Sequence, residues 1–373
     1  MKKGKIILIT HEYPPQRGGA GVYCEELAYA ARQLSIDLEI WAPKNSITND
    51  SAHLILMPQK GSQDWACSWR LYRFLKKNLG DNKYLHIADP GTLRAMIRFG
   101  WLLKDLPPTI LTIHGSELLR FTRFAPEKFL FKHLLKRSQK IHVLSQHNAE
   151  KLTLLCPEVS ERIQKIPGAP ARNVIPETSS TATHCKNTTD HLLTLLCVGR
   201  IHPRKGQYEL IDAINKLNRS NQEKLVCRIA GPVIDQSYFK KLKILAAQSA
   251  SQIIFTGELN DTSLKHEYQK SDLFALTSIP QKKSIEGFGF VYLEASAHGL
   301  PIIAHKTGGV EDAVIDGQTG FLANPNNRNE LKQKLETLIT DSVLRQKMSN
   351  NGKAWAQQHS WEFVAQNLYA DKE

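Results

Sequence analysis

The sequence predicts an α/β protein built from two doubly wound domains, each a parallel sheet covered by helices. Short apolar runs alternate with helical patterns along nearly the whole chain, which is typical of parallel sheets. The alternation stops at a polar stretch, residues 176–191, and then begins again. A chain of 373 residues is also long enough for two domains of ordinary size.

The first predicted domain covers residues 1–175. Strands that are buried on both faces of a parallel sheet appear in a sequence as short, continuous apolar runs. Such runs predict strands at residues 5–10, 38–42, 54–57, 85–88, 109–113, 141–144 and 163–166. Helical patterns lie between most of them, for example at residues 22–34, 69–79 and 93–103.

The second predicted domain covers residues 192–355 and follows a linker, residues 176–191, that is rich in Ser and Thr and has no periodicity. Its predicted strands are residues 193–198, 226–230, 253–256, 273–277 and 302–304. The chain has a helical pattern from about residue 330 to residue 369. We expect residues 356–373 to form a final helix that crosses back to the first domain.

Several classes of protein are excluded by composition. No apolar run approaches the ~18 residues that a membrane-spanning helix needs. The apolar run at residues 6–9 is too short for the core of a signal peptide and is interpreted as the first strand. The six cysteines are scattered, without a Cys-x-x-Cys pair, which favours reduced thiols. We therefore expect a cytoplasmic protein.

The net charge of +13 is distributed unevenly. Residues 1–172 contain 26 Lys and Arg against 15 Asp and Glu, a net charge of +11, whereas residues 173–373 contain 23 against 21. A basic first half indicates an anionic partner. Nucleic acid, an anionic membrane surface and a phosphorylated substrate all fit this charge.

Ligands of doubly wound domains bind at the carboxyl ends of the strands. We therefore expect two such domains to face a central cleft, and candidate residues to follow the strands directly. After the first strand come Gly18, Gly19 and Gly21, which suit either a turn with positive φ or the close approach of an anion. His114 follows the strand at residues 109–113 in the same way.

A basic turn follows the strand at residues 193–198. It contains Arg200 and Lys205, with Pro203 between them and Gly206 where a helix is expected to begin. Two cations beside a helix N-terminus favour the binding of a diphosphate, although a solvated basic turn has the same composition.

The segment from Glu286 to Ala295 is the most informative part of the chain. Glu286 and Glu294 flank a glycine-containing turn, and a helix is expected to open at Gly289 or Phe290. Two carboxylates beside an anion site would repel a bare phosphate ester, but they can accept hydrogen bonds from sugar hydroxyls. The pair therefore favours a sugar nucleotide as the ligand.

Together these motifs resemble glycosyltransferase family 4, which has the GT-B fold and retaining chemistry. Glu286 and Glu294 are followed by Ala295-x-Ala297-x-Gly299-x-Pro301. The supporting motifs occur in the family's order and are Gly18-Gly19, His114-Gly115-x-Glu117, Gly199-Arg200 with Lys205-Gly206, Thr307-Gly308-Gly309 and Gly317-x-Thr319-Gly320. Pro203-Arg204-Lys205-Gly206 is most similar to the branch of phosphatidylinositol and lipid-linked mannosyltransferases. The chain departs from the family at residues 167–170, where Pro-Gly-Ala-Pro replaces the usual Pro-Asn-Gly-Val-Asp.

The resemblance implies a role for each motif. Arg200 and Lys205 would bind the donor diphosphate, Glu294 the ribose and Glu286 a sugar hydroxyl, and His114 would lie over the transferred sugar. The implied catalytic residues are His114, Glu286, Arg200 and Lys205. The implied donor-binding set adds Gly19, Gly257, Leu259, Gly287, Phe288, Gly289, Phe290, Val291 and Glu294. The implied acceptor-binding set is Tyr13, Gly18, Gly19, His114, Glu117 and Arg123.

No metal and no cofactor are expected beyond the nucleotide sugar itself. The chain has no Asp-x-Asp motif, and two side-chain cations with a helix dipole can stabilise a departing diphosphate. In the retaining interpretation, the departing phosphate oxygen deprotonates the acceptor hydroxyl. Glu286 as a nucleophile remains a second possibility.

A membrane-facing surface is a further hypothesis. Residues 118–140 contain seven Lys and Arg and one acid, interleaved with Phe121, Phe124, Phe129 and Phe131. A helix is expected to start at Pro126, with a stripe of lysines at positions 128, 132, 136 and 140. Residues 65–77 repeat this mixture with Trp65 and Trp69. A solvated helix face is the alternative.

The expected function is transfer of a hexose, with mannose from GDP-mannose as the best candidate, to a lipid-linked or glycan acceptor at the cytoplasmic face of a membrane. Nucleic acid is not expected as a partner, because it would leave the two glutamates without a role. The alternatives are a UDP-sugar-dependent transferase, a sugar-nucleotide epimerase, or a non-catalytic protein that binds nucleotide sugars or nucleic acid.

Overall fold

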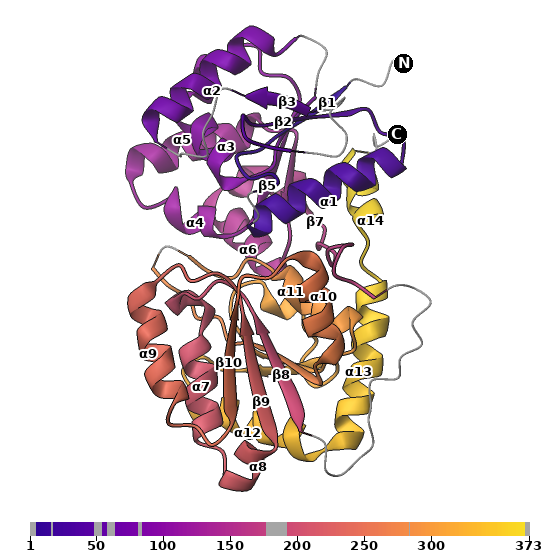
Figure 1. The fold of residues 1–373 in the computed structure, drawn as a ribbon. Helices are drawn as coiled ribbons and strands as arrows, with labels where there is room; N and C mark the ends of the chain where they lie inside the picture. Colours follow the sequence, from indigo (N-terminus) through magenta and orange to yellow (C-terminus); the bar gives the residue numbers. More distant parts are fainter. Residues whose placement is uncertain are drawn as a thin grey trace. The chain divides into compact units, whose positions relative to one another are not determined.

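The computed structural model describes residues 5–15, 18–47, 54–57, 64–80, 84–176, 192–282 and 284–369. The chain divides into two compact units (Figure 1): Met1–Gly168 together with Ser360–Glu373, and Ala169–His359. The second unit thus begins before the predicted boundary at residue 175. Residues 177–191 of the predicted linker lie outside the described residues.

The first unit contains a parallel sheet with the strand order β3-β2-β1-β4-β5-β6-β7. The strands are β1 Ile6–Ile9, β2 Leu38–Pro43, β3 Leu54–Met57, β4 Tyr84–Ile87, β5 Thr109–Ile113, β6 Lys140–Val143 and β7 Ile163–Lys165. Each matches a predicted strand to within a few residues. The order reverses between β1 and β4, which is where doubly wound sheets bind ligands.

Helices cover both faces of this sheet. They are α1 Gly19–Gln33, α2 Trp65–Asn78, α3 Pro90–Phe99, α4 Ser116–Arg120, α5 Ala125–Arg137 and α6 Gln146–Leu155, with 3-10 helices η2 Gly100–Leu102 and η3 Pro157–Arg162. Ile87, Leu111 and Ile141 face the apolar core that α2, α3 and α5 close. Because strand side chains alternate between faces, His86, Thr112 and His142 point to the other face, where they are buried under α1.

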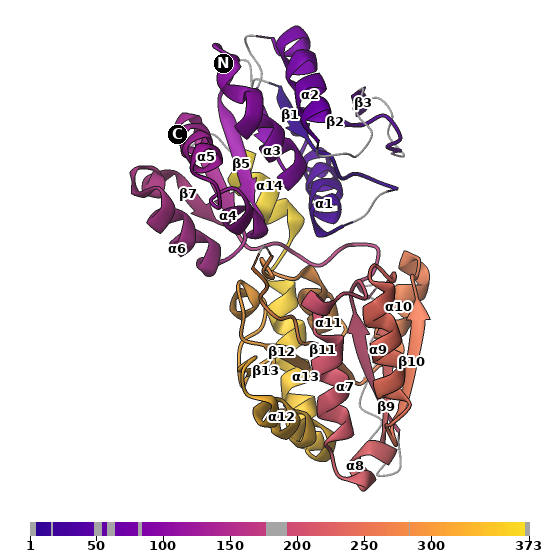
Figure 2. The ribbon, with the colours of Figure 1, turned by 90° about the vertical axis from the view of Figure 1, so that its left-hand side faces the viewer.

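The end of the chain belongs to the first unit. Helix α14 (Trp361–Tyr369) packs along α1 (Figures 1 and 2). The hydroxyl of Tyr369 lies 2.7 Å from His86 Nδ1, and Lys140 Nζ donates to the Leu368 carbonyl at 3.0 Å. A single helix over residues 356–373 was expected, but the chain breaks between α13 (Ser342–Gln357) and α14.

The second unit is another parallel sheet, with the order β10-β9-β8-β11-β12-β13. Its strands are β8 Leu193–Val198, β9 Leu225–Ala230, β10 Gln252–Gly257, β11 Leu273–Leu276, β12 Ile302–His305 and β13 Gly320–Ala323. The sequence did not predict β13, because its short run begins with glycine. This sheet reverses between β8 and β11, so the loops after these two strands form its ligand-binding edge.

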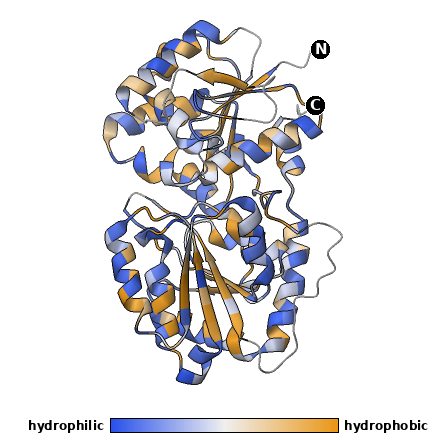
Figure 3. Ribbon diagram, in the orientation of Figure 1, coloured by the Kyte–Doolittle hydropathy of each residue, from blue (hydrophilic) through white to orange (hydrophobic). Residues whose placement is uncertain are grey.

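Most helices of the second unit carry both apolar and polar residues, whereas β8, β9 and β10 are mostly hydrophobic (Figure 3). The helices are α7 Gln207–Asn215, α8 Arg219–Glu223, α9 Gln236–Ala246, α10 Asp261–Lys270, α11 Phe290–Ala297, α12 Arg328–Thr340 and α13, with 3-10 helices η4 Pro203–Lys205 and η5 Val310–Asp312. None of the helices in the described part of the chain combines the length and apolar composition that crossing a bilayer demands.

Candidate active site

The carboxylate of Glu286 is the centre of a charged cluster in the second unit. Its Oε2 accepts hydrogen bonds from Lys205 Nζ at 2.8 Å, Arg204 Nη1 at 3.0 Å and Ser278 Oγ at 2.9 Å. All three donors come from the loops that follow β8 and β11, where the strand order reverses. Its Oε1 accepts no hydrogen bond from the residues that the structure describes.

The cluster keeps Glu286 ionised. Burial by itself would raise the pKa of this carboxyl group, but the charges of Lys205 and Arg204 outweigh burial and lower the pKa to about 2. Burial lowers the pKa of Lys205, and the Glu286 carboxylate opposes that shift. The result is a fixed anionic acceptor held by two cations.

Two glycines allow these loops to meet. Gly206 has a φ of 70°, and a Cβ there would lie 1.7 Å from the Thr277 carbonyl oxygen. Gly308 has a φ of 58°, and a Cβ there would lie 2.1 Å from the Glu286 carbonyl oxygen. Any other residue would therefore push Lys205 away from β11, or the 307–309 loop away from Glu286.

Arg204 and Ser278 are site residues that the sequence analysis missed. Arg200, which the sequence predicts to bind the diphosphate with Lys205, is exposed, and Arg204 contacts Glu286. Arg204 lies beside Lys205 in the basic turn, and Ser278 is the second residue after β11. The carboxyl-end position of Ser278 was the signal that could have revealed it.

Glu294 lies on α11, separate from this cluster. Its Oε2 accepts a hydrogen bond from the Tyr268 hydroxyl at 2.8 Å, and the Tyr268 ring stacks on His298 with centroids 5.2 Å apart. The side chain is therefore pre-oriented by a buried tyrosine. Helix α11 begins at Phe290, as predicted, after Gly289 with a φ of 92°.

The other residues predicted to bind the donor carry no polar side chain, so only their backbone N–H and C=O groups can form hydrogen bonds with it. Phe288 and Phe290 bury their rings against each other, with centroids 5.8 Å apart. Gly257 has a φ of 73°, with open space where a Cβ would be. The remaining members of the set, Gly287, Val291 and Leu259, are partly exposed.

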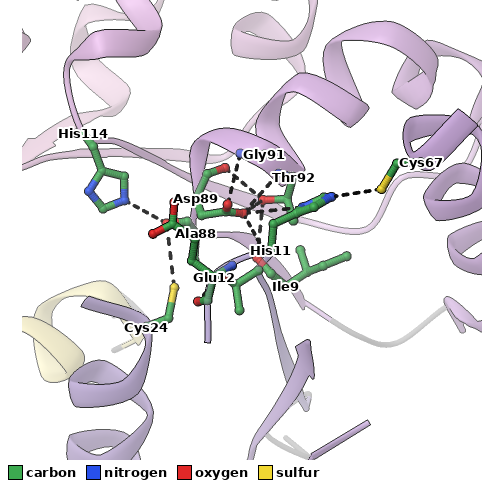
Figure 4. Close-up of polar contacts among 11 residues, drawn as sticks. Ile9, His11, Glu12, Cys24, Cys67, Ala88, Asp89, Gly91, Thr92 and His114 are labelled. Atoms are coloured by element: carbon green, nitrogen blue, oxygen red, sulfur yellow. Dashed lines mark hydrogen bonds and ion pairs between the residues drawn. The ribbon is translucent and has the colours of Figure 1, made fainter. Parts of the chain in front are cut away.

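In the first unit, His114 follows β5, and three groups hold it. Its Nε2 lies 2.9 Å from the Ala88 carbonyl oxygen (Figure 4). Its backbone N–H donates to Glu117 Oε1 at 3.0 Å. The rings of His114 and Tyr23 are perpendicular, with centroids 5.2 Å apart. Because a carbonyl only accepts, Nε2 carries the hydrogen.

The Ala88 carbonyl is itself held in place by Asp89, which the sequence analysis did not single out. Asp89 caps α3 by accepting from the backbone of Gly91 and Thr92, and it also accepts from the His11 N–H at 3.1 Å (Figure 4). It thereby joins the loops after β1 and β4. The Asp-Pro pair directly after a strand was the available signal, since proline favours the first helical position.

The predicted acceptor residues differ in exposure. Tyr13 and Glu117 are buried, whereas Arg123 is exposed and lies 5.5 Å from the Phe124 ring centre. Neither Gly18 nor Gly19 has a positive φ. A Cβ at Gly18 would lie within 2.4 Å of the Glu12 carboxylate, so a larger residue there would displace the end of that side chain.

The predicted lysine stripe is shorter than expected. Helix α5 carries Lys128, Lys132 and Lys136, but Lys140 begins β6 and binds the Leu368 carbonyl. Lys136 forms an ion pair with Glu158 at 2.7 Å. Phe121 and Phe131 are buried, whereas Phe124 and Phe129 are 61% and 71% exposed.

Within the described ranges, no group of three His, Cys, Asp or Glu side chains could hold a metal ion. Five cysteines in these ranges are buried free thiols: Cys24, Cys67, Cys156, Cys197 and Cys227.

Two family models match the chain. The model of Glycosyltransferase Family 4 matches residues 17–169, and the model of Glycosyl transferases group 1 matches residues 185–355. Together they cover both units.

Similar proteins share nearly the full length of the chain. A GDP-mannose-dependent alpha-(1-6)-phosphatidylinositol monomannoside mannosyltransferase from Mycobacterium tuberculosis is 30% identical over 388 residues, which cover 98% of this chain and 97% of the relative. An uncharacterized glycosyltransferase from Methanocaldococcus jannaschii is 26% identical over 95% of this chain and 94% of its own.

Solved structures agree on the fold. The Anabaena protein HepE, in complex with UDP and glucose, matches with a TM-score of 0.74 at 20% identity, covering 98% of each chain. Sucrose-phosphate synthase from Thermosynechococcus elongatus matches with a TM-score of 0.77 at 19% identity, covering 98% of this chain and 97% of its own. With the two family models, these matches show that the chain belongs to glycosyltransferase family 4 and is a glycosyltransferase with the GT-B fold.

Proposed function

We propose that this enzyme transfers mannose from GDP-mannose to a lipid-linked or glycan acceptor, with retention of configuration and without a metal ion. The observation that carries the proposal is the ionised Glu286, held by Lys205 and Arg204 through Oε2, while its Oε1 accepts no hydrogen bond from the described residues. A full-length relative at 30% identity is named as GDP-mannose-dependent, which supports the choice of donor.

The charges of the cluster suit a diphosphate leaving group. Lys205 uses one of its three ammonium hydrogens on Glu286, so two remain for phosphate oxygens. Arg204 has further guanidinium hydrogens beyond the one donated to Glu286. As the bond from the sugar's anomeric carbon to the diphosphate breaks, these cations stabilise the charge that develops on the leaving oxygen.

Glu286 acts in this proposal as a hydrogen-bond acceptor for a hydroxyl of the transferred sugar. Its Oε2 is occupied by three donors, which lowers the basicity of the carboxylate, and a pKa of about 2 keeps it ionised at neutral pH. A carboxylate whose negative charge is compensated by two cations in this way is a poor nucleophile. The acceptor hydroxyl therefore attacks the anomeric carbon directly, and its proton passes to the departing phosphate oxygen.

His114 supplies a complementary group in the first unit. With its Nε2 hydrogen donated to Ala88, the imidazole ring presents Nδ1 to a sugar or acceptor hydroxyl. Glu294, oriented by Tyr268, binds the ribose.

A membrane surface is the proposed location of the acceptor. Helices α2 and α5 both pack on α3 and carry exposed aromatic side chains, including Trp65 and Trp69 of α2, which are 64% and 44% exposed. The guanidinium of Arg98 lies 4.4 Å from the ring centre of Trp65. Aromatic rings beside cations are typical of surfaces that dock on anionic lipid. We place this surface on the cytoplasmic face of the membrane.

A donor panel tests the proposal. Purified enzyme is incubated with GDP-mannose, UDP-glucose and other nucleotide sugars, with and without a lipid extract, and the anomeric configuration of the product is read by NMR. We expect GDP-mannose to be consumed with the extract, the α-linkage to be retained, and EDTA to leave the rate unchanged. Preference for a UDP-sugar would overturn the choice of donor, and release of free sugar without an acceptor would overturn the transfer reaction. Rescue of an EDTA-treated enzyme by Mg²⁺ would overturn the metal-free mechanism.

A further inference from the structure

A buried chain of hydrogen bonds in the first unit has no role in the proposed reaction. It joins Tyr23 on α1, His86 on β4, Thr112 on β5, His142 on β6 and Tyr369 on α14. His86 lies 2.7 Å from the Tyr369 hydroxyl through Nδ1 and 2.8 Å from Thr112 Oγ1 through Nε2. The Tyr23 hydroxyl lies 3.0 Å from both Thr112 Oγ1 and His142 Nδ1.

The directions of these bonds follow from one end. His142 Nε2 lies 2.8 Å from the Ile166 carbonyl oxygen and so carries a hydrogen, and burial lowers the pKa of this ring to about 4, so it is neutral. Its Nδ1 must then accept, either from the Tyr23 hydroxyl at 3.0 Å or from Thr112 Oγ1 at 3.2 Å. Thr112 can donate to Tyr23, His86 to Thr112 and Tyr369 to His86, so each hydroxyl hydrogen in the chain finds an acceptor.

The ring of Tyr23 is held on several sides. Besides its hydroxyl bonds, it contacts Trp361 of α14 with centroids 5.6 Å apart, and it meets His114 at 90° with centroids 5.2 Å apart. Tyr23, His86, Thr112 and His142 are fully buried, whereas His114 is partly exposed. His114 is thus the side chain through which this buried cluster reaches the ligand-binding edge of the sheet.

Filling a core with polar side chains costs free energy of desolvation. Apolar side chains of the same volume would fill this space without the cost of removing three hydroxyls and two imidazoles from water. A fully satisfied hydrogen-bond network fixes one geometry instead, because any shift leaves a buried group unpaired. The geometry fixed here includes the ring against which His114 packs.

We infer that Tyr23 is a positioning residue for His114, and that helix α14 helps to hold Tyr23 in place through Tyr369 and Trp361. Tyr23 holds the imidazole in the orientation in which Nε2–H donates to Ala88 and Nδ1 is free to accept a substrate hydroxyl. This inference rests on the role of His114 in the proposed function.

The test removes single hydroxyls from the full-length enzyme. Tyr23→Phe and Tyr369→Phe are compared with Tyr238→Phe, which removes a buried hydroxyl that accepts from the Tyr208 N–H in the second unit. The readouts are kcat, KM for the donor, and the ¹⁵N chemical shifts of His114, assigned from a His114→Gln spectrum. These shifts report which ring nitrogen carries the hydrogen.

We expect Tyr23→Phe to lower kcat about fivefold, the size of one neutral hydrogen bond, with KM for the donor unchanged. The His114 shifts should move away from the pure Nε2–H form. Tyr369→Phe should change both readouts in the same direction but less, because it acts through His86 and Thr112. Tyr238→Phe should leave the His114 shifts unchanged.

His114→Ala separates this inference from the proposed function. If His114→Ala lowers kcat but Tyr23→Phe changes neither kcat nor the ¹⁵N shifts, the positioning role is wrong and the role of His114 stands. If His114→Ala has no effect on kcat, the proposed role of His114 is wrong, and the shifts alone decide whether Tyr23 positions the ring. Thermal unfolding of each variant verifies folding, and Tyr369→Phe replaces Tyr23→Phe should the latter unfold.

Discussion

In the second unit, ion pairs hold the central site residue, whereas hydrogen bonds to the backbone and an aromatic contact hold its counterpart in the first unit. Glu286 is fixed by Lys205 and Arg204, two cations within 3.0 Å of one oxygen. The His114 ring is fixed by the Ala88 carbonyl and the ring of Tyr23, and the His114 backbone N–H donates to Glu117 Oε1. The ion-paired arrangement suits a group that must meet a developing charge, and the hydrogen-bonded one suits a group that must only be oriented.

The difference predicts the largest effect at Lys205. Lys205→Ala should lower kcat by about 10²-fold or more, because it removes a charge-assisted contact that strengthens as the diphosphate departs. Steady-state kinetics with the identified donor measure this. Lys216→Ala, which breaks an exposed ion pair with Asp212, is the matched control and should leave kcat unchanged. A loss of only a few-fold at Lys205 would contradict the diphosphate assignment.

Acid should weaken two clusters, the buried histidines of the first unit and the ion pairs of Glu286 in the second, in different pH windows. Burial lowers the pKa of His142 from 6.5 to about 4 and that of His86 well below 6.5, so the unfolded chain binds more protons than the folded chain as pH falls below 6.5. The stability of the first unit therefore declines from about pH 6.5 to pH 4, by about 3 kcal/mol for His142 alone. For Glu286, with a pKa lowered from 4.5 to about 2, the decline begins only below pH 4.5.

Hydrogen exchange with mass spectrometry at pH 7, 5.5 and 4.5, corrected for the intrinsic pH dependence, measures this order. Amides of β4, β5 and β6 should lose protection before those of β8 and β11. His142→Gln serves as the comparison, since it removes the titrating group and should flatten the pH dependence in the first unit. Earlier loss of amide protection at β8 and β11 would show that the buried histidines are not the acid-sensitive cluster.

The two glutamates of the second unit should divide affinity from rate. Glu286→Gln should lower kcat about tenfold with little change in donor affinity, because its contact to the sugar strengthens in the transition state. Glu294→Gln should instead raise KM for the donor, because ribose contacts are equal in both states. Isothermal titration with the donor and steady-state rates distinguish them. The reverse pattern would mean that their roles are exchanged.

The smallest expected effect on catalysis concerns the surface of the first unit. Lys128→Glu with Lys132→Glu should weaken sedimentation with liposomes of acidic phospholipid at least about 30-fold at low salt, because each basic residue near anionic lipid contributes roughly 1 kcal/mol. Lys240→Glu with Lys241→Glu makes the same charge change on α9 of the second unit and should have no effect. Donor hydrolysis in solution should be spared in both. Wild-type protein that ignores acidic liposomes at low salt would refute the docking surface.

The sequence by itself determined the strands, the helix starts and the loops that carry chemistry. Apolar runs and glycines act within a few residues, so the seven strands of the first sheet and the helix opening at Phe290 could be predicted locally. The strand β13 could not, because a run that begins with glycine has no strand signal of its own. Lys140 was predicted to continue the lysine stripe because of its spacing, but helix α5 ends at Arg137 and Lys140 begins β6.

The tertiary structure decided which side chains meet. Arg204 and Lys205 are hydrogen-bonded to Glu286, which lies 82 and 81 positions further along the chain. They meet because the reversal of strand order brings the loops after β8 and β11 together. Likewise, Tyr369 reaches His86 across 283 positions because α14 packs on α1. Local pattern sets the conformation of each segment, but only the packing of strands and helices sets the distances between groups so far apart in the chain.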